Sequence, residues 1–127
     1  MKRLSVLSTC SFSVLLFVLM IFSLYPQVSY AHAPQDVTLE YDSSAQTLAV
    51  TITHKSSFPG FHHIKTVEIK NNAAVISTTN YDSQHGKSQF TYTYKLAAVQ
   101  GDKLEVTATC NMSGSKTATI TVSRATK

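Results

Sequence analysis

The sequence has no tryptophan and only two cysteines, and no window shows sustained helical periodicity or an internal repeat. The missing helical period argues against a helical bundle, and the missing repeat argues against a solenoid. Lysine and arginine do not cluster, so we predict that nucleic acid is not a partner. Charged residues are also missing altogether between Leu4 and Gln35. The chain therefore divides into an uncharged leader and a remainder that carries most of the charge.

The leader has the features of an export signal. Lys2 and Arg3 precede a long apolar run, and small residues follow the run at Ser29 and Ala31. This order is typical of a secretory signal peptide. We therefore predict a signal peptide over residues 1–31, cleavage before His32, and a periplasmic or secreted protein. The apolar run is also long enough for an uncleaved anchor, which is the one contact with a membrane that the sequence predicts.

The mature domain, residues 32–127, has nine basic and seven acidic side chains, so its net charge is +2. A chain of this size forms one small domain with a modest core. Cys10 lies in the leader, so Cys110 is the single cysteine of the mature domain. In an exported protein such a thiol indicates a buried inert residue, a link to another chain or a metal ligand.

Alternation of apolar and polar residues, rich in β-branched and aromatic types, recurs along the mature domain and predicts β-strands. The predicted strands cover residues 37–41, 47–53, 64–69, 75–78, 90–94, 104–110 and 117–122. Turn signals such as Pro59-Gly60 and Asn71-Asn72 separate them. Seven short strands predict an all-β fold, a seven-stranded immunoglobulin-like β-sandwich or barrel. The cysteine pair and tryptophan of a true immunoglobulin domain are missing.

Histidine is the main candidate for chemistry. The histidines are His32, His54, His62, His63 and His85. Imidazole is the commonest metal ligand and thiolate is the softest, so several histidines and Cys110 can form an iron, copper or zinc site. For any single histidine, a solvated surface residue is the ordinary alternative. We assign His85, in a polar turn beside Gly86, to that alternative.

The predicted strand ends bring three of these side chains toward an edge of the sandwich. His54 ends one strand and His62 opens the next, on either side of the Pro59-Gly60 loop. Cys110 ends its strand just before the turn at residues 111–114, so its thiol can also reach an edge. The spacing therefore permits a shared site.

Three motifs resemble those of the superoxide reductases and the iron-binding domain of desulfoferrodoxin. His32-Ala33-Pro34 is similar to the His-x-Pro that begins the family's iron domain. Residues 62–69, HHIKTVEI, are similar to its strand His-Tyr/His-Ile-x-x-Ile-x-Leu. Residues 110–114, CNMSG, are similar to its Cys-Asn-Leu-His-Gly turn. The motifs occur in the family's order over nearly all of the mature chain, and the family's fold is a seven-stranded immunoglobulin-like β-barrel.

The resemblance implies a site and an activity. The family holds ferrous iron between histidines in a plane and an axial cysteine thiolate, and it reduces superoxide to hydrogen peroxide. Carried over, the equatorial ligands are His32, His54 and His62, the axial ligand is Cys110, and His63 is a neighbour of the site whose side chain points away from that of His62. Lys55 is then the residue best placed to attract superoxide, with an ordinary solvated lysine as the alternative. The electron donor stays unknown.

The chain also departs from the family. The family's fourth histidine comes three residues after the cysteine, where this chain has Ser113, a poor iron ligand. The reduced ligand set would bind iron more weakly or suit copper or zinc. If cleavage exposes His32, its α-amino group and imidazole can chelate one metal together, as in the histidine brace of secreted copper proteins. His54 is followed by Lys55 where the family has proline, so His54 is the weakest match.

Three functions agree with these observations. The first is an exported mononuclear iron protein that reduces superoxide. The second is a periplasmic or cell-surface module that binds iron or copper without turnover. The third is a structural or interaction sandwich in which Cys110 is a buried apolar residue beside Val106 and Ala108, because a free cysteine often behaves as a small hydrophobic side chain.

Overall fold

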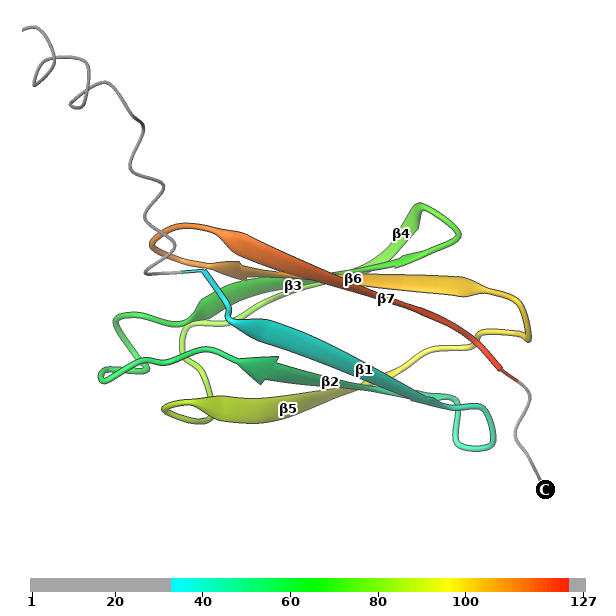
Figure 1. The fold of residues 1–127 in the computed structure, drawn as a ribbon, viewed down its shortest axis with the longest axis horizontal. Coiled ribbons are helices and arrows are strands. Elements are labelled where there is room, and N and C mark those ends of the chain that lie inside the picture. Colours follow the sequence, from blue (N-terminus) through cyan, green and yellow to red (C-terminus); the bar gives the residue numbers. More distant parts are fainter. Residues whose placement is uncertain (1–32, 124–127) are drawn as a thin grey trace, which may run out of the picture.

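The computed structural model describes residues 33–123, which form two antiparallel β-sheets. The strands are β1 (Asp36–Asp42), β2 (Thr47–Thr53), β3 (Ile64–Asn71), β4 (Ala74–Asn80), β5 (Gln89–Lys95), β6 (Lys103–Cys110) and β7 (Ser115–Thr121). One sheet has the order β1-β2-β5 and the other β4-β3-β6-β7, and the two pack face to face (Figure 1). This arrangement confirms the predicted all-β, seven-stranded, immunoglobulin-like sandwich.

Two predicted features lie outside the described residues. The leader over residues 1–31 is one, and His32 with the cleavage site before it is the other. Within residues 33–123, the structure has no helix long and apolar enough to cross a membrane.

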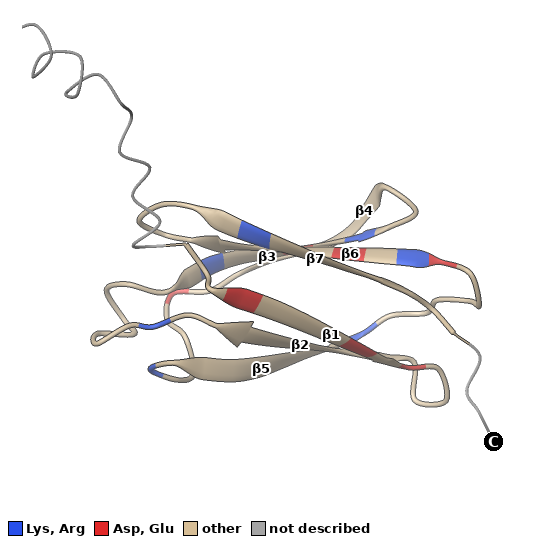
Figure 2. Ribbon diagram, in the orientation of Figure 1, with Lys and Arg blue, Asp and Glu red and all other residues tan. Residues whose placement is uncertain are grey.

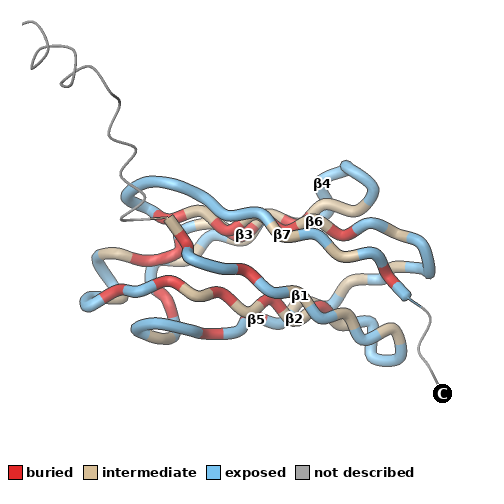
Figure 3. The backbone as a smooth tube through the Cα atoms, in the orientation of Figure 1, coloured by how far each residue is buried: buried red, intermediate tan, exposed pale blue. Residues whose placement is uncertain are grey.

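The core lies between the sheets and is built from alternate strand residues. Successive side chains of a strand point to opposite faces, so every second residue of a sandwich strand enters the core. Leu48, Val50 and Ile52 of β2 are fully buried, and so are Leu104 and Val106 of β6. Figure 3 shows this alternation of buried and exposed positions along both sheets. The predicted core faces of these two strands are therefore confirmed.

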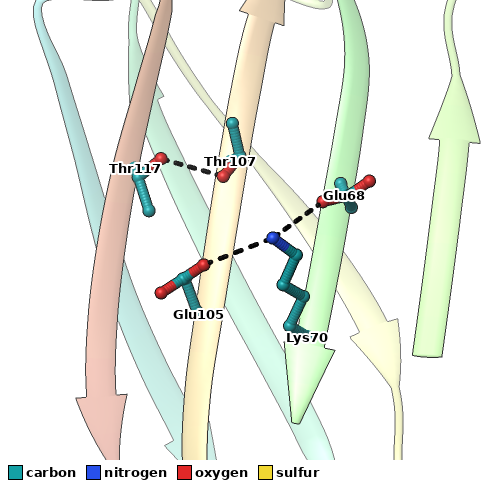
Figure 4. Close-up of polar contacts among 5 residues, drawn as sticks. All are labelled: Glu68, Lys70, Glu105, Thr107 and Thr117. Atoms are coloured by element: carbon teal, nitrogen blue, oxygen red, sulfur yellow. Dashed lines mark hydrogen bonds and ion pairs between the residues drawn. The ribbon is translucent and has the colours of Figure 1, made fainter. Parts of the chain in front are cut away.

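The outer faces carry threonine and a few charged residues. On β6 and β7, the hydroxyl groups of Thr107 and Thr117 are 2.8 Å apart (Figure 4). Beside them the ammonium group of Lys70 lies 3.4 Å from Glu68 and 3.6 Å from Glu105. Polar pairs on a solvent-facing sheet surface, within a strand or between strands, contribute little each, on the order of 0.2–1 kcal/mol. Threonine side chains therefore replace much of the charge that an exposed sheet face usually carries.

The β3–β4 hairpin has a tight two-residue turn, as Asn71-Asn72 predicted. Asn72 and Ala73 have φ values of 49° and 70°, and a positive φ at both central residues favours asparagine and fits the twist of a hairpin. The side chains of Asn71 and Asn72 donate hydrogen bonds to the Asp102 carboxylate. With the backbone N–H of Val99, they hold the pKa of Asp102 below its ordinary value.

Three loops meet at the opposite end of the sandwich, on the left in Figure 1. They are the β2–β3 loop (residues 54–63), the β4–β5 loop (residues 81–88) and the β6–β7 turn (residues 111–114). Backbone hydrogen bonds tie them together, because His54 N–H donates to Ser88 O and Asn111 N–H donates to His63 O. Figure 2 shows positive charge on the β2–β3 and β4–β5 loops, each of which contains a lysine. This end of the fold carries the candidate site.

Candidate metal centre

His54 continues the line of β2 beyond the last strand residue, Thr53. Its backbone N–H donates to the carbonyl oxygen of Ser88 over 2.8 Å, so it extends the pairing of β2 with β5. Its side chain is 1% exposed. The alternation of β2 sends Leu48, Val50, Ile52 and then His54 to the same face, which places an imidazole at the end of the hydrophobic core.

Gln84 fixes the orientation of the His54 ring. The Nε2 atom of Gln84 donates to the carbonyl oxygens of His54 (3.0 Å) and Gly86 (2.6 Å). Because both partners are acceptors, this end of the amide is the NH₂ group, and Oε1 is the atom that faces His54. Oε1 lies 2.7 Å from His54 Nδ1 and can only accept, so Nδ1 carries the proton. The lone pair of the neutral ring is therefore on Nε2, the nitrogen that can bind a metal.

His62 lies in the β2–β3 loop, two residues before β3 begins at Ile64. The prediction that His62 opens the strand was therefore wrong. The reason is a turn that ends at His62, in which the backbone N–H groups of Phe61 and His62 both donate to Phe58 O over 2.9 Å. The turn directs the His62 ring toward His54, with the ring centroids 4.6 Å apart and the planes at 69°.

Cys110 is the last residue of β6, as predicted, and it is 4% exposed. Its backbone N–H donates to Gly114 O over 3.0 Å and closes the β6–β7 turn. The backbone N–H of Met112 points at the Cys110 sulfur from 3.4 Å. The turn therefore supplies a backbone hydrogen-bond donor to the sulfur atom.

Gly114 is required in this turn for two reasons. Its φ is +82°, which side chains rarely adopt. A Cβ atom at this position would also lie 2.6 Å from the Cβ of Ala33. The close approach places the first described residue, Ala33, against the turn that follows Cys110.

The ligating atoms of His54, His62 and Cys110 all lie within 4.8 Å of one another. Ligand atoms around one first-row metal ion are separated by roughly 3 to 4.5 Å, given metal–nitrogen and metal–sulfur bonds of about 2.1 and 2.3 Å. Two imidazoles and a thiol therefore fit a single metal ion here after small movements. A purely structural cysteine would have apolar neighbours, whereas this thiol faces two imidazoles. The three side chains can hold a metal ion.

Several other predicted residues lie near this cluster without belonging to it. His63 is buried, and its Nε2 atom donates to Tyr81 O over 3.1 Å. His85 is exposed, as predicted, and packs edge-on against Tyr92. Lys55 and Ser113 are also exposed, the first in the loop between His54 and His62 and the second in the turn after Cys110. Of the predicted ligands, His32 lies outside the described residues.

Sequence reasoning missed two supporting residues. Gln84 precedes His85 in the same polar turn, and nothing in the sequence marks it as buried, yet it is 4% exposed. Asn111 was noticed only as part of the motif after Cys110. Its side chain accepts from His63 N–H over 3.0 Å and donates to Phe61 O over 2.7 Å, on either side of His62. Asn111 therefore joins the two chain segments that carry His62 and Cys110.

No protein-family model matches the chain, and no curated protein matches it. Among solved structures, it is similar to the superoxide reductase (neelaredoxin) from Ignicoccus hospitalis, with 17% identity and a TM-score of 0.45 over 78% of this chain and 87% of that one. A variant of that protein has 16% identity and a TM-score of 0.46 over 76% and 85%. The superoxide reductase from Nanoarchaeum equitans has 16% identity and a TM-score of 0.42 over 72% and 92%.

Proposed function

We propose that this protein is an exported, mononuclear iron protein of the superoxide reductase type, which reduces superoxide to hydrogen peroxide. The observation that carries the proposal is the convergence of His54, His62 and Cys110, with their ligating atoms within 4.8 Å of one another. Two of these residues belong to sequence motifs that resemble the family's ligand motifs, and we assign His54 to the place of a third family ligand.

The reaction needs one electron and two protons for each superoxide. Iron, when bound, would supply this electron, and a separate electron donor would have to return the metal to the ferrous state. Cys110 would hold the iron through its sulfur and raise the electron density available there, and the Met112 N–H group directed at that sulfur would limit the effect. His54 and His62 complete the described part of the ligand set. His32 would add an imidazole and, after cleavage of the leader, an α-amino group.

Lys55 is our candidate for drawing superoxide toward the site. It follows His54 directly and lines an open pocket together with His62. A positive charge beside a metal site raises the local concentration of an anionic substrate and speeds its arrival. Both protons of peroxide come from water or a nearby donor, because the pocket is open to solvent.

The purified protein tests this proposal directly. We expect near-stoichiometric iron and, after oxidation, a visible thiolate-to-iron charge-transfer band that Cys110→Ser abolishes. Met112→Leu should keep the band, because it retains the backbone N–H next to the sulfur. Superoxide consumption without release of dioxygen would establish a reductase. Protein that stays colourless and metal-free after anaerobic reconstitution would refute the metal site, and an intact mass that includes Ala31 would refute cleavage before His32.

A metal-binding module without turnover is the second candidate, and the serine at position 113 favours it. Ser113 is exposed in the turn where the family has its fourth histidine. Fewer imidazoles weaken the hold on iron relative to copper, which binds nitrogen and sulfur ligands more tightly. Competition between iron and copper, with superoxide consumption measured for each loaded form, separates this candidate from the reductase.

A further inference from the structure

An open pocket adjoins the candidate metal centre and has the composition of an anion site. Two lysines and three serines line it, and His62, which also belongs to the candidate metal centre, lines it too. The lysines are Lys55 and Lys87, and the serines are Ser56, Ser57 and Ser88. The acidic residues of the described chain are absent from its lining. The pocket therefore presents hydrogen-bond donors and positive charge to solvent.

The backbone brings the two lysines together. Beyond the last paired residues of β2 and β5, His54 N–H donates to Ser88 O and Ser56 N–H donates to Lys87 O over 2.8 and 2.7 Å. Lys55 and Lys87 are thus neighbours on adjacent chain segments. Within residues 33–123, the ion pairs involve Lys70 and neither of these two lysines. Like charges at neighbouring positions are unfavourable, and an anion between them removes the repulsion.

Ser56 supplies an independent observation. The residue is 5% exposed, and its buried Oγ atom has no hydrogen-bond partner among the described residues. A buried hydroxyl group without a partner destabilises a protein, so native structures rarely keep one unless something binds it. Ser56 lines the same pocket as the two lysines. Rotation of the Ser56 side chain toward the pocket would let a bound oxyanion accept the hydrogen bond that this hydroxyl group lacks.

We propose that this pocket binds a phosphate group, with Lys55 and Lys87 as the charged contacts and Ser56 as a buried hydrogen-bond donor. Phosphate matches the set because its oxygens accept several hydrogen bonds at once and carry the complementary charge. The group can come from free inorganic phosphate or from the headgroup of an anionic lipid. Phe58 also lines the pocket and is 74% exposed, so the apolar contact needed for a lipid is present. The site does not depend on a bound metal.

Titration with inorganic phosphate tests the site. The NMR chemical shifts of the backbone amides report binding, in both the metal-free and the metal-loaded protein. We expect phosphate to change the amide shifts of residues 55–57 and 87–88 in both forms. The affinity for phosphate should fall as the ionic strength rises. The double variant K55Q/K87Q should bind about tenfold more weakly, because each exposed charge contributes about threefold. The matched control, K65Q/K116Q, changes two exposed lysines outside the pocket and should bind as the native protein does. Equal binding by both double variants would overturn the proposal.

Ser56→Ala separates binding from folding. A serine that serves only the fold should destabilise the protein when it is removed. A serine held for a ligand should leave thermal stability equal or higher in phosphate-free buffer, while phosphate binding weakens. Loss of stability with unchanged phosphate binding would contradict its role in the site.

Vesicles distinguish the two sources of phosphate. Binding to phosphatidylglycerol vesicles, lost in both K55Q/K87Q and Phe58→Ser, assigns the site to lipid headgroups. Phosphate binding without vesicle binding assigns it to free phosphate, and binding of neither would refute the site. Phosphate binding is tested on the metal-free protein, so its absence would not contradict the proposed iron chemistry. Absence of iron binding would likewise not contradict the phosphate site.

Discussion

Gln84 Oε1 and His54 Nδ1 lie 2.7 Å apart inside the protein, and this contact determines which nitrogen of His54 could bind a metal. The two residues are 30 positions apart in the chain. The amide of Gln84 cannot rotate without losing its bonds to two carbonyl oxygens. The contact therefore orients one ligand before any metal binds, which is the usual task of a group behind a metal-binding histidine.

Replacement of Gln84 should weaken metal binding. Gln84→Leu keeps the side chain's bulk but removes its acceptor, so the His54 ring loses its fixed orientation and tautomer. We expect metal affinity to fall about 10- to 100-fold, measured by competition with a chelator. Gln89→Leu is the matched control, because Gln89 is exposed on β5. Equal losses in both variants would show that Gln84 does not act through His54.

Asn111→Ala should loosen the loop that carries His62. The change removes two hydrogen bonds to that loop, from His63 N–H and to Phe61 O, and should lower the free energy of unfolding by about 1 kcal/mol. Amide hydrogen exchange at His63 should accelerate more than exchange in the core of β6. Asn80→Ala, on exposed β4, serves as the control. Unchanged exchange at His63 would contradict this role.

Ser113→His should strengthen metal binding. Ser113 is exposed in the turn beside Cys110, so an imidazole there meets little steric hindrance and offers another ligand. We expect slower loss of iron to a chelator and a shifted charge-transfer band. Ser115→His adds the same side chain at the exposed start of β7 and should change neither measurement. If both variants behave alike, position 113 does not face the metal.

Alkaline pH should destabilise the fold through Tyr92. Burial, together with the nearby Tyr81, raises the pKa of Tyr92 from 10.0 to about 12. The folded state therefore favours the neutral phenol, and this contribution to stability is complete below pH 10.0 and is lost as the pH rises toward 12. Unfolding by denaturant at a series of alkaline pH values measures the loss, and absorbance reports phenolate formation. Tyr92→Phe should flatten the decline, and an unchanged slope would contradict the assignment.

The fold was readable from the sequence because each strand carries its own signal. Leu48, Val50 and Ile52 alternate with threonine and alanine. This alternation predicts a strand with one buried face, which is β2. The weaker pattern of β4 gave a shorter predicted strand, residues 75–78, than the observed Ala74–Asn80. Val75 and Ile76 are exposed there, so hydrophobicity did not mark which face meets the core.

The candidate site was only partly readable. The sequence by itself determined the candidate ligand types and placed Cys110 at the end of β6, because alternation and turn residues are local properties. Only the tertiary structure decided that His54, His62 and Cys110 meet, and that Gln84 and Asn111 hold them. Those contacts join residues from different strands and loops, and nothing in local periodicity specifies how loops fold over the end of a sandwich. Packing of the two sheets brings the loops together, and hydrogen bonds between them fix where each side chain points.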